Sequence, residues 1–179
     1  IEDSAELQIQ NAPNLVRMET RNANAEGCRE ITIRDLIRTS LRMRPDRLIV
    51  GEVRGKEALD LLQCLNTGHD GSLSTGHANS ARDMLSRLET MVLMGMELPV
   101  SAIRRQIASG IDIIIHLGRM RDRTRKVLEI AEVIGMEKEE IQMETLYLFE
   151  EDTKIKGREV RGRLVCKKEL LHREKLIAA

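Results

Sequence analysis

The alternation of apolar and polar positions predicts that strands and helices follow one another along the chain. Residues 14–21 alternate and predict a strand, and residues 22–27 form a polar turn. Thr32 is expected to cap a helix that runs to about Met43, because apolar residues recur there at helical spacing. Residues 48–50 are continuously apolar and β-branched, which predicts a short central strand of a parallel sheet.

Two further helices are predicted after this strand, with a segment of small polar residues between them. Residues 56–66 carry one apolar face and predict the first helix. Residues 68–80 are rich in Gly, Ser and His, and we expect a short strand at residues 72–75 and an N-cap at Ser80. The methionines of the following helix are expected to fill the core. Its apolar face is predicted to contain Leu85, Leu88, Met91 and Val92.

The period of the pattern changes in the second half of the chain. A helix is predicted over residues 100–108, and the segments after it alternate, which predicts an antiparallel tail on the sheet. The alternating or apolar runs are residues 113–117, 126–133 and 144–149. Residues 150–162 are highly charged and predict a loop, followed by a strand at residues 164–166 and a short helix at residues 170–177. We therefore expect an α/β fold with a mainly parallel sheet and an antiparallel C-terminal extension.

Composition excludes several function classes. With 179 residues and 41% hydrophobic content, the chain can bury a core, and no apolar stretch approaches the length of a membrane span or a secretory signal. Lys+Arg and Asp+Glu both total 29, so net charge gives no general attraction to nucleic acid or anionic membrane. An aromatic content of 1% argues against stacking on single-stranded nucleic acid. Cys28, Cys64 and Cys166 form no CxxC pair, which indicates reduced thiols in a cytosolic protein.

Charged and imidazole side chains gather where the expected parallel strands end. Glu52 and Arg54 follow the central strand, and sites in open α/β sheets form beyond such carboxyl ends. A salt-bridged strand end is the alternative. His69 and His77 bracket the glycine-rich segment and could aim both rings at one ligand. A zinc site with Cys64 would lack a tight motif and an evident fourth ligand, and two unrelated loop histidines are the interpretation that the residues alone favour.

Three segments, in this order, resemble the secretion ATPases of type II and type IV systems. Residues 1–3, Ile-Glu-Asp, look like the Asp box of that family, and residues 48–54 look like its Walker B box. Residues 68–78 look like its His box. The stretch from residue 41 to residue 55 is most similar to the branch that assembles tight-adherence (Flp-type) pili. The resemblance extends to about Phe149 and more loosely to Leu176.

This resemblance implies a RecA-like αβα P-loop ATPase domain at residues 1–149 and a C-terminal appendage at residues 150–179. Such proteins act as hexamers, bind ATP with Mg²⁺ between subunits, and work with an inner-membrane platform protein of a pilus or secretion system. We therefore expect ATP hydrolysis that powers pilus assembly or protein secretion. We also expect a cytoplasmic location, peripheral to the inner face of the membrane, and no nucleic-acid partner.

The resemblance also implies roles for the acidic residues. Glu52 would polarise the attacking water, and Glu2 would place that water or the Mg²⁺. Gly51 stands where most P-loop ATPases carry the Asp that holds Mg²⁺, so the metal would be held elsewhere, by Glu2 or Asp3. These two carboxylates begin the sequence without a preceding element to position them, which suggests a fragment of a larger protein.

The remaining site residues are basic. By resemblance His77 would sense the γ-phosphate of ATP and register its loss. His69 would orient the same box, and Arg54 would border the nucleotide site and hold neighbouring elements together. No G-x-x-x-x-G-K-[ST] motif occurs in the sequence, so the phosphate cradle is absent and we expect these residues alone to be inactive.

Two other functions remain open at this stage. A RecA-like interaction or scaffold domain could keep the fold and lose hydrolysis, although retention of Glu2, Glu52 and His77 argues against it. A DNA-translocating motor is a weaker alternative, because the low aromatic content and neutral charge do not suit it.

Overall fold

The computed structural model describes residues 1–23, 27–152 and 157–174. It divides into two compact units. The first contains residues 1–77 and 87–99, and the second contains residues 78–86 and 100–179. Within the described residues, no helix is both long and apolar enough to cross a membrane.

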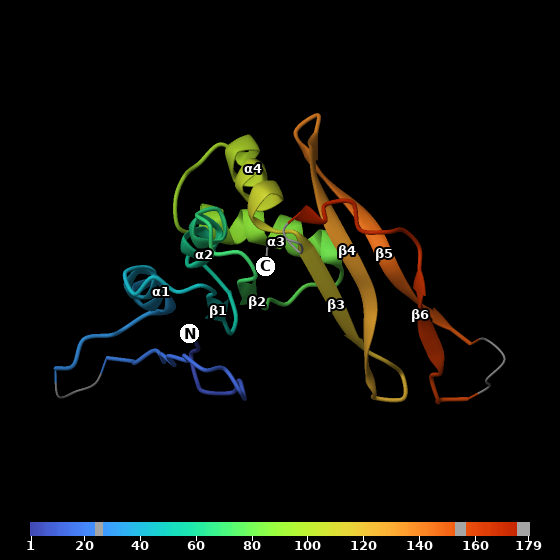
Figure 1. Ribbon diagram of the computed structural model, residues 1–179, viewed down its shortest axis with the longest axis horizontal. Helices are drawn as coiled ribbons and strands as arrows, with labels where there is room; N and C mark the ends of the chain where they lie inside the picture. The colour runs from blue at the N-terminus through green and yellow to red at the C-terminus, as the bar shows by residue number, and fades with distance from the viewer. Residues whose placement is uncertain (24–26, 153–156, 175–179) are drawn as a thin grey trace. The chain divides into compact units, whose positions relative to one another are not determined.

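The first unit is built on a parallel pair of strands, β1 (Ile49–Val50) and β2 (Leu73–Ser74) (Figure 1). The chain start lies along the other side of β1: the backbone nitrogen of Ile1 donates to the Ile49 carbonyl at 2.8 Å, and Gly51 N–H donates to the Ile1 carbonyl at 2.8 Å. β1 is therefore flanked on both sides, which confirms the predicted central strand.

Helix α1 (Ile33–Leu41) begins at the predicted cap. The hydroxyl of Thr32 accepts from Asp35 N–H at 3.2 Å, and the Asp35 carboxylate accepts from Thr32 N–H at 3.0 Å. This reciprocal arrangement is a capping box, in which two otherwise unpaired donors of the first turn are satisfied.

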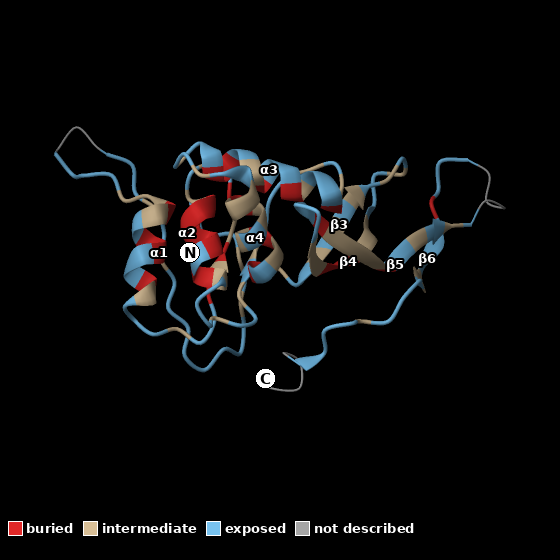
Figure 2. Cartoon of the chain, turned by 90° about the horizontal axis from the view of Figure 1, so that it is seen from above, coloured by how far each residue is buried: buried red, intermediate tan, exposed pale blue. Residues whose placement is uncertain are grey.

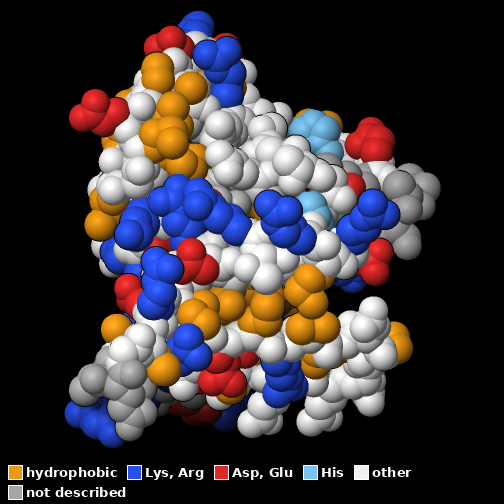
Figure 3. Space-filling view, turned by 90° about the vertical axis from the view of Figure 1, so that its left-hand side faces the viewer, with side chains coloured by type: hydrophobic (Ala, Val, Ile, Leu, Met, Phe, Trp, Pro, Cys, Tyr) orange, Lys and Arg blue, Asp and Glu red, His pale blue; other side chains and the backbone are white. Residues whose placement is uncertain are grey.

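A buried carboxylate joins α1 to helix α2 (Ala58–Leu65). Asp60 is 4% exposed, and its two oxygens lie 2.7 Å from Arg34 Nε and 3.0 Å from Arg38 Nε. One buried negative charge thus anchors two arginines of the neighbouring helix. Lys and Arg side chains gather in a band across this side of the molecule (Figure 3).

The core of the first unit lies along α2, where buried side chains are concentrated (Figure 2).

Helix α3 (Ala81–Leu93) begins after Ser80, whose hydroxyl accepts from Asp83 N–H at 3.0 Å, as predicted. The expected apolar face of α3 is buried, which confirms the methionine there as core filler. Its members are Leu85, Leu88, Met91 and Val92.

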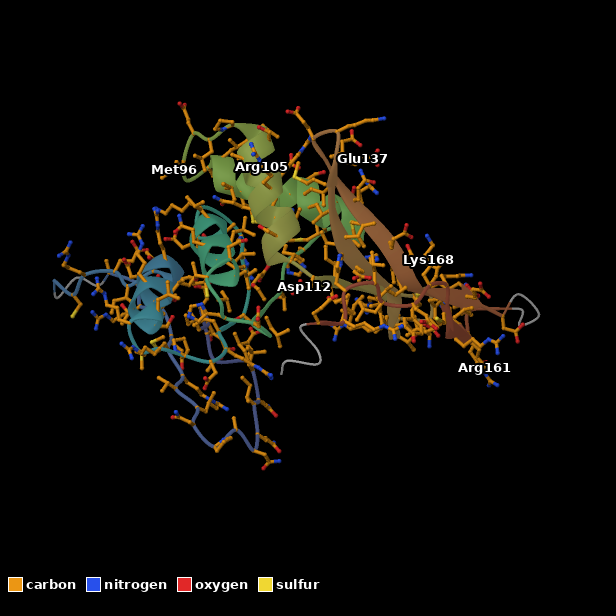
Figure 4. The ribbon with its side chains drawn as sticks, turned by 45° about the horizontal axis from the view of Figure 1, so that its top comes forward. Met96, Arg105, Asp112, Glu137, Arg161 and Lys168 are labelled. Carbon is orange, nitrogen blue, oxygen red and sulfur yellow. The ribbon has the colours of Figure 1, made fainter. Side chains whose placement is uncertain are left out.

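The second unit contains an antiparallel sheet with the strand order β3-β4-β5-β6 (Figure 1). The strands are β3 (Ile113–Arg119), β4 (Arg125–Glu137), β5 (Glu140–Glu151) and β6 (Gly162–Cys166). Helix α4 (Val100–Gly110) packs on β4 and β5 and buries Ile103 and Ile107. Glu137 lies at the tip of the β4–β5 hairpin (Figure 4). The antiparallel pairing is thus confirmed, but in the described residues these strands form a sheet of their own and do not extend the parallel pair β1–β2.

The segment after β6 crosses β5 and β4 and is held by a buried carboxylate. Lys167 N–H donates to the Leu146 carbonyl of β5 at 2.7 Å. Glu132 of β4 is 2% exposed and accepts from the backbone N–H groups of Leu171 and His172, each at 2.8 Å. The ring nitrogen Nδ1 of His172 lies 3.0 Å from the same carboxylate.

Four expectations need correction. Residues 14–21 form no strand, because only Glu19 and Arg21 make isolated bridges and the side chain of Val16 is exposed. In the described residues the parallel sheet is the smaller one, with two strands against four. β5 continues to Glu151, so the charged loop begins later than residue 150. No helix forms at residues 170–173. Residues 24–26, 153–156 and 175–179, parts of the predicted turn, loop and last helix, lie outside the described residues.

Candidate active site

Three of the predicted residues meet beyond the carboxyl ends of β1 and β2. Arg54 Nη2 lies 2.5 Å from Glu52 Oε2, and His77 Nε2 lies 3.1 Å from Glu52 Oε1. The Glu52 side chain is 18% exposed, whereas those of Arg54 and His77 are 68% and 82% exposed. A largely buried carboxylate is therefore held between two solvent-accessible basic groups.

The environment keeps Glu52 ionised. The hydrogen bond and the charge of Arg54 hold the pKa of Glu52 below its ordinary range, although partial burial opposes the shift. Glu52 Oε1 is buried and accepts no hydrogen bond from the described residues, because His77 lies at ion-pair distance without hydrogen-bond alignment. This oxygen therefore has unused capacity to accept a proton donor or to bind a cation.

A second predicted site residue, Glu2, is also a buried carboxylate. Glu2 is 8% exposed, and its Oε1 accepts from the backbone N–H groups of Glu6 at 2.8 Å and Leu7 at 2.7 Å. These two bonds lower the pKa of Glu2, so it too is ionised near neutral pH. The bonds leave its second oxygen available.

A side chain on Gly51 would crowd Glu2. A Cβ on Gly51 would lie 3.1 Å from Glu2 Cγ and 3.5 Å from the Ile1 carbonyl oxygen. An Asp at this position, which most P-loop ATPases carry before the catalytic Glu, would collide with Glu2. The side chain of Glu2 thus lies next to the region that such an aspartate side chain would fill.

Gly51 also links the three predicted boxes through its peptide groups. Its N–H donates to Ile1 in the first box, and its carbonyl accepts from the Thr75 hydroxyl in the third at 2.5 Å. Val53 N–H in turn donates to the Thr75 carbonyl at 3.0 Å. Sequence reasoning missed Thr75, because nothing in its local pattern distinguishes it from the other small polar residues of the segment.

The turn after Glu52 is shaped by another residue that the sequence did not single out. Glu57 Oε1 accepts from the backbone N–H groups of Arg54 at 2.6 Å and Gly55 at 2.8 Å. A carboxylate that accepts two successive backbone donors fixes the direction of the chain between them. The available signal was its position at the start of α2, where acidic residues are favoured.

Two predicted site residues have other partners. The exposed Asp3 accepts from the Thr20 hydroxyl at 3.3 Å. His69 Nδ1 lies 3.2 Å from the Cys64 carbonyl oxygen and 3.3 Å from the Thr67 hydroxyl, so its ring closes the turn after α2. In the described part of the chain, no group of three or more His, Cys, Asp or Glu side chains could hold a metal ion.

Parallel strands with charged side chains beyond their carboxyl ends define an α/β protein whose site lies at those ends. The type II/IV secretion system protein family matches residues 1–176. The chain therefore belongs to this family, as the sequence motifs predicted.

Individual relatives agree with this assignment. A protein assigned to conjugal transfer in Mycobacterium tuberculosis is 45% identical over 131 residues, which are 73% of this chain and 37% of that protein. Conjugal transfer protein TrbB of Rhizobium radiobacter is 34% identical over 155 residues, which are 87% of this chain and 44% of TrbB. The chain thus spans less than half the length of these relatives.

A solved structure is also similar. The VirB11 ATPase of the Brucella suis type IV secretion system, crystallised in complex with sulphate, is 33% identical with a TM-score of 0.61. The match covers 72% of this chain and 38% of VirB11. This similarity in sequence and fold agrees with the family assignment.

Proposed function

We propose that these residues form the C-terminal part of a secretion ATPase that hydrolyses ATP to power pilus assembly or protein secretion. The observation that carries the proposal is the buried, unbonded Oε1 of Glu52, 3.1 Å from His77 at the carboxyl end of a central parallel strand. Catalysis of phosphoryl transfer depends mainly on positioning and electrostatic stabilisation, which such a carboxylate and imidazole can supply.

In this proposal each side chain has one task. Glu52 Oε1 accepts a hydrogen bond from the attacking water and orients it, and the lowered pKa of Glu52 keeps that oxygen ionised. His77 is exposed on the solvent side of Glu52, where its ring donates to the γ-phosphate. Arg54 neutralises the second oxygen of Glu52.

The oxygens of this site suit Mg²⁺, which prefers carboxylates and water. Glu2 enters the space next to Gly51, and one of its oxygens lies outside the bonds to Glu6 and Leu7. Glu2 would therefore hold the metal, directly or through water, with Asp3 as the weaker candidate because it binds Thr20. When bound, Mg²⁺ neutralises charge on the phosphate oxygens.

The wider assembly belongs to the same proposal. The complete protein acts as a hexamer at the cytoplasmic face of the inner membrane, where it contacts a platform protein. His69 supports the loop that carries His77, since its ring contacts the end of α2. Membership of the tight-adherence branch remains a prediction from residues 41–55, because the relatives described above include conjugal transfer and VirB11 proteins.

A non-catalytic scaffold domain is the main alternative, and Glu52→Gln in the full-length protein separates the two. Gln keeps the shape and loses the charge, so ATP binding should persist while turnover falls at least about a hundredfold. Glu97→Gln, on an exposed residue of the same unit, is the matched control and should leave turnover unchanged. Near-normal phosphate release by the Glu52 variant would support the scaffold.

A further inference from the structure

The hydroxyl of Thr75, in the third box, bonds to the segment after β1 that contains Glu52. Thr75 Oγ1 donates to the Gly51 carbonyl at 2.5 Å, and the Thr75 carbonyl accepts from Val53 N–H at 3.0 Å. These two bonds attach to the peptide groups on either side of Glu52. Thr75 is therefore hydrogen-bonded to the backbone both before and after Glu52, and neither bond involves the Glu52 carboxylate.

The same residue lies next to the imidazole partner of Glu52. His77 follows Thr75 by two positions, and its Nε2 lies 3.1 Å from Glu52 Oε1. The relative position of these two side chains therefore depends on how residues 75–77 are attached to residues 51–53. The main-chain bond from Val53 is one attachment, and the Thr75 hydroxyl is the other.

The Thr75 side chain does not belong to the apolar core of this unit. The Thr75 side chain is exposed, whereas the apolar residues on either side of the β1 end, Val50 and Val53, are 0% and 2% exposed. If the role of Thr75 were to pack the core, its side chain would be buried as those two valines are. An exposed hydroxyl that bonds to the backbone carbonyl before Glu52 indicates a role in holding the two segments in place.

We propose that Thr75 is a positioning residue that sets the distance between Glu52 and His77 through its bond to the Gly51 carbonyl. The proposal rests on the proposed function, in which these two side chains act on water and phosphate. Loss of the hydroxyl lets the third box shift relative to Glu52. A misplacement of reacting groups lowers the rate of the chemical step much more than it lowers substrate affinity.

The test compares two variants in the full-length protein. Thr75→Val keeps the shape and removes the hydroxyl, and Thr75→Ser keeps the hydroxyl and removes a methyl group. We expect Thr75→Val to lower kcat about tenfold with KM for ATP within about twofold, and Thr75→Ser to stay within about threefold of wild type. Circular dichroism melts establish that both variants fold.

Each outcome bears on the proposal separately from the proposed function. Unchanged kcat in Thr75→Val, while Glu52→Gln is inactive, would overturn the positioning role and leave the ATPase assignment standing. Equal loss in the Val and Ser variants would also overturn it, because the hydroxyl would not be the determinant. If Thr75→Val fails to fold, Thr75→Cys, with its weak donor, replaces it and must show the same loss of kcat.

Discussion

Glu2 Cγ lies 3.1 Å from the point where a Cβ on Gly51 would stand. Gly51→Ala should therefore displace Glu2 and lower the free energy of unfolding by about 1–3 kcal/mol, as expected for overpacking. Gly55→Ala is the matched control, because its added Cβ would meet its nearest neighbour, Glu57, at an ordinary 3.4 Å. Urea unfolding of both variants checks the prediction, and equal stability of the two would contradict it.

The second prediction concerns the exposed imidazole. The His77 side chain is 82% exposed, so His77→Ala removes little packing and should leave the melting temperature within about 2 °C of wild type. If its ring senses γ-phosphate, ATP hydrolysis and pilus assembly or secretion should nevertheless fall. Melts measured beside steady-state kinetics separate the two roles. A fall in melting temperature that accounts for the lost activity would make His77 structural.

The third prediction is a pH dependence from Glu2. Its pKa is lowered in the folded state by the N–H groups of Leu7 and Glu6, so the unfolded chain binds a proton more readily. The stabilisation is complete above about pH 4.3, the ordinary pKa of glutamate, and is lost as pH falls through the folded value. Glu2→Gln should therefore make the free energy of unfolding fall less steeply as the pH is lowered below about 4.3. Glu6→Gln, at an exposed position, should leave that fall unchanged.

A fourth prediction concerns the segment held by Glu132. Burial alone would raise the pKa of Glu132, but the N–H groups of Leu171 and His172 and the His172 ring hold it below its ordinary value. Glu132→Gln turns one oxygen into a donor that faces other donors, which should cost about 1–3 kcal/mol of unfolding free energy. Amide exchange at Leu171 and His172 should accelerate. Glu137→Gln, at the exposed hairpin tip of the same strand, should change neither measurement.

The fifth prediction is that residues 1–179 alone neither hydrolyse ATP nor bind it tightly. The sequence lacks the loop whose backbone N–H groups and lysine contact the phosphates. Glu2 and Glu52 then repel the phosphate oxygens unless Mg²⁺ intervenes. Calorimetric titration with Mg-ATP measures this directly. Micromolar binding would show that the nucleotide site lies elsewhere in these residues.

Local signals in the sequence predicted most helices and strands well. The hydroxyls of Thr32 and Ser80 each accept from a backbone N–H of the first turn that follows, a local contact, so both caps could be identified without tertiary information. Alternation at residues 14–21 failed, because a strand also needs a partner and a core to cover its apolar side. The side chain of Val16 is 55% exposed and has no such cover.

The site was only partly predictable for a similar reason. Glu52, Arg54 and His77 could be found because strand ends and family boxes place them close together. The partners of Glu2 could not, since Glu6 and Leu7 reach its carboxylate through a loop without a regular pattern. Asp60 and Glu132 interrupt apolar runs, which was a visible sign of buried charge. Only the folded chain reveals which arginines or backbone groups satisfy them.

The absence of a side chain at position 51 has a consequence for how such proteins vary in evolution. The side chain of Glu2 lies where a side chain at position 51 would begin, so a larger residue at either position crowds the other. A family member with Ala or Asp at the position of Gly51 should therefore carry a shorter residue at the position of Glu2, so the two positions should covary. In this chain the space beside Gly51 is filled from the first box, by the side chain of Glu2.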